Sequence, residues 1–305
     1  MCNLTNPIFT DETAAIAHME ADRWPTEVTC PLCGVVGEAT KMGGKTQAGM
    51  FLCNACRGKF TVLTGTVFAR SHIPTHKWLL ALELMAASKK GISAHQLHRM
   101  LGITYKSAWF MAMRIREAMA PTKDEGPLGG EGQVVEADEL YTGRRKGVRR
   151  PRAGSAHKMT VVSLVERGGR ARSFHLDNFG SPDALTITNL VKANVLPGTR
   201  LHTDESSLYR ETKDHVAKHE TVNHSRKEYA RGDVTTNSVE GYFSVFERGI
   251  VGVYQHVSEQ HLKRYLAEFD FRQNNRAKLG VDDATRANRI LKGAENKRLT
   301  YRQVA

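Results

Sequence analysis

Two pairs of cysteines near the N-terminus constrain this chain more than any other feature. Cys30-Pro-Leu-Cys33 and Cys53-Asn-Ala-Cys56 each enclose two residues, and 19 residues separate the pairs. This spacing is typical of a zinc site, because two such turns offer four thiolates in the tetrahedral arrangement that Zn²⁺ prefers. Four thiolates leave no open position for water, so we predict one structural ion. The alternative interpretation is a chance pairing of buried cysteines.

The sequence around these cysteines predicts a small metal-dependent module. Residues 26–66 are rich in Gly, Cys and Thr, which favours turns and short strands, and the pattern suits a zinc ribbon. A segment this short has little core, so the metal is expected to supply its stability. Residues 10–24 predict a helix capped by Thr10. We therefore place a helix and a zinc ribbon in residues 1–70, and we interpret Cys2 as a free thiol.

The charge of the chain predicts a polyanionic partner. The 305 residues carry a formal charge of +12, which indicates nucleic acid first and an anionic membrane second. No stretch is long and apolar enough to span a membrane, and the N-terminus lacks a signal-peptide pattern. We therefore expect DNA rather than a membrane as the partner, and a cytoplasmic location. Paired cysteines that bind metal fit a reducing compartment.

Residues 71–120 predict three helices and a DNA-binding domain. Pro74 starts the first helix, Ser93 caps residues 94–101, Gly102 ends that helix and Thr104 caps the next one. Two helices joined by a short turn with glycine are typical of a helix-turn-helix, whose second helix reads bases. The alternative is a three-helix bundle without DNA contact. The candidate DNA-binding residues on this last helix are Lys106, Ser107 and Arg114.

After a predicted linker at 121–132, rich in Gly, Pro and charge, the pattern becomes that of an α/β domain over 133–276. Strands are predicted at 133–143, 159–167 and 170–177, a helix at 182–194, and a further strand that ends at Asp204. Three strands, a helix and a strand begin a ribonuclease-H-like fold. In that fold the first and fourth strands are neighbours, so Asp138 would face Asp204. The fold class is thus α/β multidomain.

Three carboxylates are the candidate catalytic residues: Asp138, Asp204 and Glu240, the last in the first turn of a helix that Thr236 or Asn237 caps. Together they can bind two Mg²⁺ or Mn²⁺ ions for in-line phosphoryl transfer. The alternatives are local. Asp204 can cap a helix, and Glu240 is favoured in any first turn by the helix dipole.

Neighbouring acids can be mistaken for ligands. Strand alternation puts Glu136 on the side of Asp138 but earlier in the strand, and it puts Glu139 on the opposite face. A similar argument favours Asp204 over Glu205.

A densely basic loop at 144–158 follows Asp138. Blocks of like charge are usually solvated, but this one adjoins the proposed metal site, so we predict a clamp on the DNA backbone. Such contacts make binding fall steeply with salt. The polar loop that contains His224, Arg226, Lys227 and Arg231 is a candidate for holding the other strand. The candidate DNA-binding residues of the basic loop are Arg144, Arg145, Lys146, Arg149 and Arg150. Residues 277–305 read as a basic tail.

From Trp24 to about Arg276 the chain resembles insertion-sequence transposases of the IS1595 type, those with an ISXO2-like catalytic domain. The resemblance lies in the segments 136-EADELYTGRRKG-147, 203-TDESSLY-209 and 237–276, and in the cysteine pairs with 53-CNACRGKFTVLTGTVF-68. It implies a DDE triad at Asp138, Asp204 and Glu240. It also implies cutting at the ends of an element and joining of those ends to target DNA.

One position departs from the family pattern. Seven residues after the triad glutamate the family usually has Lys, in Phe-Lys-Arg-Gly, whereas this chain has Phe246-Glu247-Arg248-Gly249. Positions 240, 244 and 247 share one helix face, so Glu247 would repel phosphates or add an acid near the metals. We expect Arg248 to contact DNA in partial compensation.

The sequence therefore predicts a metal-dependent DNA transposase that recognises terminal inverted repeats, acts on target DNA and assembles as a homo-oligomer on DNA, the last by analogy only. One alternative is an inactive or repurposed copy that acts as a sequence-specific DNA-binding protein. Another is a nuclease that cuts without joining.

Overall fold

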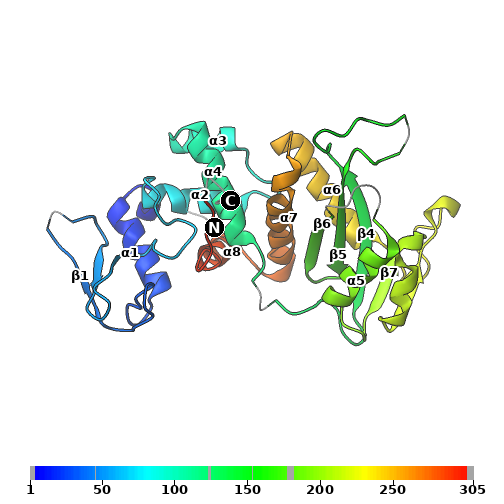
Figure 1. Cartoon of the computed structure of the whole chain (residues 1–305), viewed down its shortest axis with the longest axis horizontal. Coiled ribbons are helices and arrows are strands. Elements are labelled where there is room, and N and C mark those ends of the chain that lie inside the picture. The colour runs from blue at the N-terminus through cyan, green and yellow to red at the C-terminus, as the bar shows by residue number, and fades with distance from the viewer. Residues whose placement is uncertain (1–3, 45, 123–124, 153, 177–181, 301–305) are drawn as a thin grey trace. The chain divides into compact units, whose positions relative to one another are not determined.

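The computed structural model describes residues 4–44, 46–122, 125–152, 154–176 and 182–300, and the chain forms two compact units. The first unit contains residues 1–120 and 280–305, and the second contains residues 121–279. The division at 120/121 falls where the predicted linker begins (Figure 1).

The first unit begins with a short 3-10 helix, η1 (Pro7–Phe9), and α1 (Glu12–Arg23). The N-cap of α1 is Asp11, whose side chain accepts the N–H of Ala14 at 2.7 Å, and not Thr10 as we predicted. The predicted turns and strands form a three-stranded antiparallel sheet. Its strands are β1 (Ala39–Lys41), β2 (Phe51–Cys53) and β3 (Lys59–Phe60).

Three further helices of this unit begin at the predicted signals. They are α2 (Thr75–Ala87), α3 (Ala94–Leu101) and α4 (Tyr105–Met119). Ser93 Oγ accepts the N–H of Gln96 at 3.1 Å, and Thr104 Oγ1 accepts the N–H of Ser107 at 3.2 Å, so both predicted caps are formed. Gly102, with φ of 59°, ends α3 in the left-handed conformation that glycine adopts without strain.

The segment that we predicted as a basic tail contains α8 (Asp283–Lys292), which packs against α2. Ile290 and Leu291 are buried, and the guanidinium of Arg286 donates to the carbonyl of Ala86 at 2.7 Å. The many charged residues of this segment lie on a helix whose apolar side joins a core. Composition alone therefore gave the wrong structure for residues 283–292.

The second unit is built on a mixed five-stranded sheet with the order β6-β5-β4-β7-β8. β4, β5 and β6 are antiparallel neighbours, whereas β7 is parallel to β4 and β8 is parallel to β7. The prediction that the first and fourth strands are neighbours is confirmed by this pairing. The strands are β4 (Val134–Thr142), β5 (Met159–Glu166), β6 (Ala171–Leu176), β7 (Arg200–Thr203) and β8 (Lys218–Thr221).

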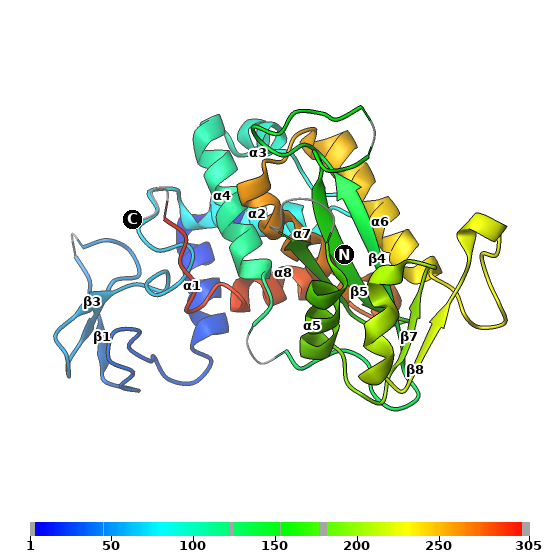
Figure 2. The ribbon, with the colours of Figure 1, turned by 45° about the vertical axis from the view of Figure 1, so that its right-hand side comes forward.

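Helices cover both faces of this sheet (Figures 1 and 2). α5 (Ala184–Asn194) buries Ile187 and Val191 against Val135, Leu164 and Leu201. α6 (Asn237–Gly249) and α7 (Glu259–Asn274) contact the other face, toward which alternate residues of the strands point. Shorter turns connect these elements: η2 (Ser207–Asp214), η3 (His224–Arg226), η4 (Ile250–Tyr254) and η5 (Ala277–Leu279). Within the described part of the chain, no helix is both long and apolar enough to cross a bilayer.

A buried carboxylate joins the two helices to the sheet. Asp270 of α7 accepts the N–H of Ser173 at 2.8 Å, the hydroxyl of Ser173 at 2.7 Å and the hydroxyl of Tyr242 of α6 at 2.6 Å. Burial raises the pKa of Asp270 from 3.8 to about 6, although these hydrogen bonds oppose the shift. The protonated carboxyl is therefore favoured by folding, and ionisation disfavours the folded state.

We predict a pH dependence of stability from this shift. Because the pKa of Asp270 is higher in the folded chain, the stability of the wild type relative to Asp270→Asn should fall as pH rises from about 4 to about 6 and then stay constant. Thermal unfolding of both proteins from pH 4 to pH 8 measures this difference. Asp214→Asn, at an exposed position, is the control and should show no such slope. A difference that grows as pH rises would contradict the prediction.

Candidate active site

The three candidate carboxylates converge at one edge of the sheet in the second unit. Val134 and Glu136 of β4 pair with Arg200 and His202 of β7, and the same register continued by two residues sets Asp138 opposite Asp204. Burial, followed by the negative charges of Asp204 and Glu240, raises the pKa of Asp138 to about 7. The N–H of Glu139, which donates to Asp138 Oδ1 at 2.7 Å, and the nearby His224 oppose this shift. Asp204 and Glu240 are therefore both close enough to act electrostatically on Asp138.

Glu240 is held by its own helix terminus. It lies exposed in the first turn of α6, where the hydroxyl of Thr236 donates to its Oε1 at 2.6 Å. Thr236 is the N-cap residue, as predicted, but its side chain makes no capping hydrogen bond and instead orients the carboxylate. His224 Nε2 lies 3.5 Å from the same oxygen of Glu240. The sequence pattern placed His224 in a polar loop but did not indicate this proximity.

Asp204 has a local role as well as a place in the cluster. Its Oδ1 accepts the N–H of Ser206 at 2.9 Å, and Ser206 is the N-cap of η2. The residue that caps the short helix η2 is therefore Ser206 and not Asp204. Asp204 stays close enough to Asp138 to influence its pKa.

The neighbouring acids have other partners. Glu205 accepts the N–H groups of His224 at 2.9 Å and Ser225 at 3.1 Å, and its pKa is lowered to about 2, chiefly by hydrogen bonds from Ser225. Glu139 lies beside the buried Tyr209, and burial raises its pKa to about 7. Glu205 therefore anchors the turn that carries His224.

Glu136 is fully buried and is bound by the start of α6 and by Arg167 of the β5–β6 turn. The sequence placed it on the face of Asp138 but gave no sign of this partner, which is distant along the chain.

Glu247 and Arg248 are exposed near the end of α6. Ser244 and Glu240 are exposed as well, so Glu247 belongs to the same open side of the helix. Arg248 Nε donates to the carbonyl of Ser244 at 2.9 Å. The negative charge of Glu247 thus faces solvent on the side of the helix that carries the third acid.

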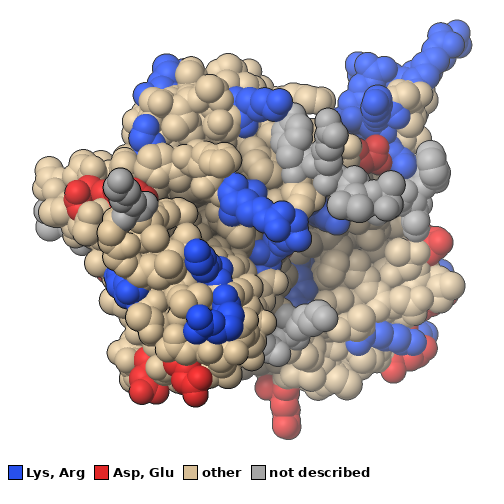
Figure 3. Space-filling model, turned by 60° about the vertical axis from the view of Figure 1, so that its left-hand side comes forward, with Lys and Arg blue, Asp and Glu red and all other residues tan. Residues whose placement is uncertain are grey.

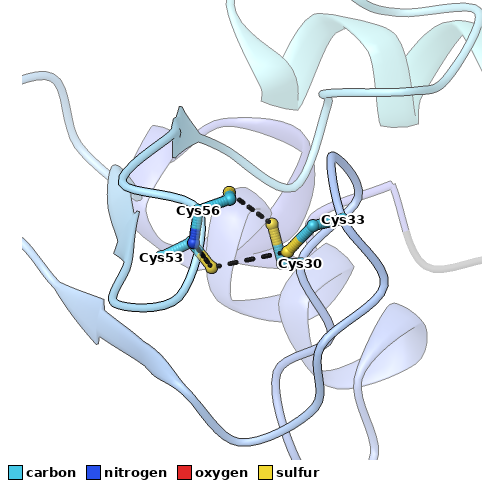
Figure 4. A group of neighbouring side chains, drawn as sticks. All are labelled: Cys30, Cys33, Cys53 and Cys56. Carbon is cyan, nitrogen blue, oxygen red and sulfur yellow. Dashed lines mark hydrogen bonds between the residues drawn. The ribbon is translucent and has the colours of Figure 1, made fainter.

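The four paired cysteines form a second candidate metal site, in the first unit (Figure 4). Cys30 Sγ lies 3.8 Å from Cys56 Sγ, Cys33 Sγ lies 3.7 Å from Cys53 Sγ, and all four sulfurs lie within 4.8 Å of one another. Sulfurs bound tetrahedrally to zinc at about 2.3 Å are about 3.8 Å apart, so these distances fit one zinc ion. Among the described residues this is the only group of His, Cys, Asp and Glu ligand atoms so closely set, and the three carboxylates are more widely spaced.

The environment of the cysteines fits a structural role. The N–H of Cys56 donates to Cys53 Sγ at 3.4 Å and lowers the pKa of the Cys53 thiol to about 7, which favours the thiolate that binds metal. Phe51, Phe60 and Trp24 pack beside the buried Cys30 and Cys53, with the two phenylalanine rings stacked 5.6 Å apart. Cys2 lies outside the described residues.

The side chains that we predicted to bind DNA differ in how exposed they are to solvent. Arg145 is only 7% exposed, and its Nε donates to Glu259 Oε1 at 3.1 Å, so it ties the basic loop to the start of α7. Arg114 is partly buried, lies over the ring of Phe110 and donates to the carbonyl of Ala69 at 3.2 Å. We therefore no longer assign these two arginines to DNA. Ser107 accepts the hydroxyl hydrogen of Thr104 at 2.9 Å. The exposed candidates are Lys106, Arg144, Lys146, Arg149, Arg150 and Arg248.

The basic loop also lines a cavity of about 490 Å³ with the start of α7. Its lining residues are Arg144–Arg149, His256, Ser258 and Glu259. Lysine and arginine side chains are prominent on the face of the molecule drawn in Figure 3.

Comparisons with known proteins identify two domains in this chain. Residues 127–274 match the ISXO2-like transposase domain, and residues 10–59 match the transposase zinc-ribbon domain. Over 282 residues the chain is 27% identical to an uncharacterized protein in transposable element ISH50 of Halobacterium salinarum, with 87% of this chain and 92% of that protein covered.

Two solved structures also share features with the chain. The Mos1 strand transfer complex is 13% identical with a TM-score of 0.31, and 71% of this chain and 74% of that chain are covered. A pre-cleavage Mos1 transpososome is 13% identical with a TM-score of 0.21, and the covered shares are 62% and 78%. TM-scores this low carry no argument about this chain.

A transposase zinc ribbon followed by an ISXO2-like domain defines the class of protein, which is a transposase. The chain belongs to the IS1595 family, with the zinc ribbon in its first unit and the matched transposase domain wholly within its second.

We predict that the zinc ribbon requires its metal. Cys53→Ser removes one of four thiolates and should reduce bound zinc from about one ion per chain to near zero, and it should lower the melting temperature of the ribbon. Zinc content by mass spectrometry and thermal unfolding measure the two effects. Cys2→Ser is the matched control and should retain the zinc. Full zinc binding by Cys53→Ser would exclude the four-thiolate site.

Proposed function

We propose that this protein is a DNA transposase that cuts at the ends of its element and joins the 3′ ends to target DNA. The observation that carries the proposal is that Asp204 and Glu240 lie close enough to Asp138 to raise its pKa, in a chain that matches a transposase domain. The sheet order, with β4 between β5 and the parallel β7, supports a ribonuclease-H-like assignment of the second unit.

The donor set fits divalent cations. All three side chains offer carboxylate oxygens, the ligands that Mg²⁺ and Mn²⁺ prefer. Burial and, after it, repulsion by Asp204 and Glu240 raise the pKa of Asp138, and a cation would relieve that repulsion. When bound, a pair of such ions activates the attacking oxygen and stabilises the leaving oxygen of an in-line phosphoryl transfer. That two ions bind, rather than one, is part of the proposal.

The residues of the chain have separate tasks in this proposal. Asp138 and Asp204 supply ligands from neighbouring strands, and Thr236 keeps the carboxylate of Glu240 turned toward them. His224 Nε2 lies 3.5 Å from Glu240 Oε1, next to this carboxylate. No covalent enzyme intermediate is needed, so we assign no nucleophilic serine or tyrosine.

DNA binding is proposed for two regions. The capped pair α3 and α4 supports a helix-turn-helix, with Lys106 exposed at the start of its second helix. The exposed cations of the basic loop would hold the phosphate backbone without reading sequence. Binding to paired terminal repeats and to target DNA, as a homo-oligomer, belongs to the same proposal.

Two alternative functions predict different reaction products from those of a transposase. A DNA-binding protein without catalysis is favoured by Glu247, whose charge opposes phosphates at a position where the family usually has lysine. A nuclease that cuts without joining would share the acids and differ only in its products.

We predict that Asp204→Asn abolishes cutting. A plasmid that carries the gene with its native flanks is incubated with protein and Mg²⁺ or Mn²⁺, and the nicked ends are mapped. Loss of a metal ligand should reduce cutting at the flank boundaries by more than about a hundredfold, whereas the exposed Asp214→Asn should cut normally. If the wild type and both variants bind the DNA equally and none shows metal-dependent cutting, the non-catalytic alternative is favoured. Glu247→Lys would then be the next variant. Cutting without joined products would favour the nuclease.

We predict that the basic loop sets the salt dependence of DNA binding. Replacing the exposed Arg144, Lys146 and Arg149 with alanine should lower affinity at low salt and reduce the slope of log K against log salt by about 2 to 3, because each lost phosphate contact removes about 0.9. The measurement is fluorescence anisotropy from 50 to 300 mM salt with one DNA. A matched triple replacement at the exposed Lys192, Lys213 and Lys278, outside the proposed DNA-binding regions, tests whether general charge alone matters. An unchanged slope in the loop variant would exclude the clamp.

A further inference from the structure

A residue of the strand β4, Glu136, caps the first turn of α6. The N-cap residue Thr236 makes no side-chain capping bond, although helix termini leave several N–H groups without partners. Glu136 of β4 supplies the missing acceptor: its Oε2 accepts the N–H of Ser238 at 2.6 Å and the N–H of Val239 at 3.1 Å. A carboxylate at this end of a helix is also favoured by the helix dipole.

Both carboxylate oxygens of Glu136 are surrounded by hydrogen-bond donors. Its Oε1 accepts the Ser238 hydroxyl at 3.0 Å and two guanidinium N–H groups of Arg167, at 2.9 Å from Nη2 and 3.1 Å from Nε. All five partners are donors, and Glu136 is fully buried. A neutral glutamine would turn an N–H₂ group against at least one of these donors, and breaking a buried charged pair is costly.

Arg167 extends the contact to the segment that enters α6. Its Nη1 donates to the carbonyl of Asp233 at 2.7 Å, and its Nη2 donates to the hydroxyl of Thr235 at 3.0 Å. The residues immediately before the helix and the first residues within it are therefore bound to one ion pair. This pair fixes both the entry and the start of α6.

The position of Glu136 relates this ion pair to the candidate active site. Glu136 and Asp138 are two residues apart on one strand, so they point to the same face with their Cα atoms about 6.6 Å apart along it. Ser238, which Glu136 holds, and Glu240 belong to one turn of α6. Because Glu136 does the capping, the hydroxyl of Thr236 is left to orient Glu240.

We propose that Glu136 and Arg167 are positioning residues that set α6 against β4 and thereby bring Glu240 beside Asp138. This inference rests on the proposed function for its metal readout. Its structural part, the attachment of the start of α6 to Glu136, can be measured without metal or DNA.

The test compares Glu136→Gln with a matched control, Glu166→Gln. Glu166 of β5 also accepts backbone N–H groups, from Gly129 at 2.7 Å and Arg170 at 3.0 Å, and it pairs with the Arg170 side chain. Both substitutions remove a charge that holds backbone and an arginine, but only Glu136 binds α6. Two quantities are measured on the full chain: amide hydrogen exchange at Ser238 and Val239, and Mn²⁺ affinity by electron paramagnetic resonance.

For Glu136→Gln we expect faster exchange of both amides and Mn²⁺ binding weakened about 10- to 100-fold, the range for residues that orient metal ligands. Glu166→Gln should leave both amides protected and Mn²⁺ affinity within about twofold of wild type. A purely structural role would lower the melting temperature without changing the Mn²⁺ affinity of the folded chain. Protected amides and wild-type Mn²⁺ affinity in Glu136→Gln would overturn the inference.

A second variant covers the case in which Glu136→Gln does not fold. Arg167→Lys keeps a positive charge beside Glu136 but cannot maintain all of the bonds to Asp233, Thr235 and Glu136. It should weaken Mn²⁺ binding severalfold, and wild-type affinity with protected amides would overturn the inference. If the wild-type chain binds no Mn²⁺, the proposed function fails, and the exchange of Ser238 and Val239 alone decides whether Glu136 anchors α6.

Discussion

The parallel pairing of β4 with β7 is the constraint on which the candidate active site depends. Residues at the same register position of neighbouring parallel strands leave the sheet side by side, so Asp138 and Asp204, 66 positions apart in the chain, meet beyond the last bonded pair. The helix α5 makes this pairing possible, because a parallel return needs a crossover connection and its apolar side covers the sheet. The third acid comes from a helix on the opposite face of the sheet.

Gathering like charges costs free energy, and the second unit offsets this cost with its backbone. Burial, followed by the negative charges of Asp204 and Glu240, raises the pKa of Asp138, whereas Glu136 and Glu205 accept N–H groups at the start of α6 and at η3. Four of the five acids in or just beyond β4 and β7 thus fall into two groups. Glu136 and Glu205 fix the elements that carry Glu240 and His224, whereas Asp138 and Asp204 are the two that we propose as cation ligands.

In the first unit, the zinc ribbon is too small to form a large apolar core. Short strands hold the two cysteine turns together, and the sulfurs lie at the spacing that one zinc ion needs. The rings of Phe51, Phe60 and Trp24 fill the space beside them. Metal binding and a small aromatic cluster together replace the apolar interior of a larger domain.

The sequence by itself determined the elements whose signals are local. The cysteine spacing, the caps at Ser93 and Thr104, the Gly102 stop and the positions of β4, β5, β6 and β7 along the chain all depend on residues close together in sequence. Only the tertiary structure decided the burial of Arg145 and Arg114, the helix at 283–292, and the partners of Glu136 and His224. These depend on contacts between segments far apart in sequence, where the same charged side chain is solvated or buried according to what folds against it.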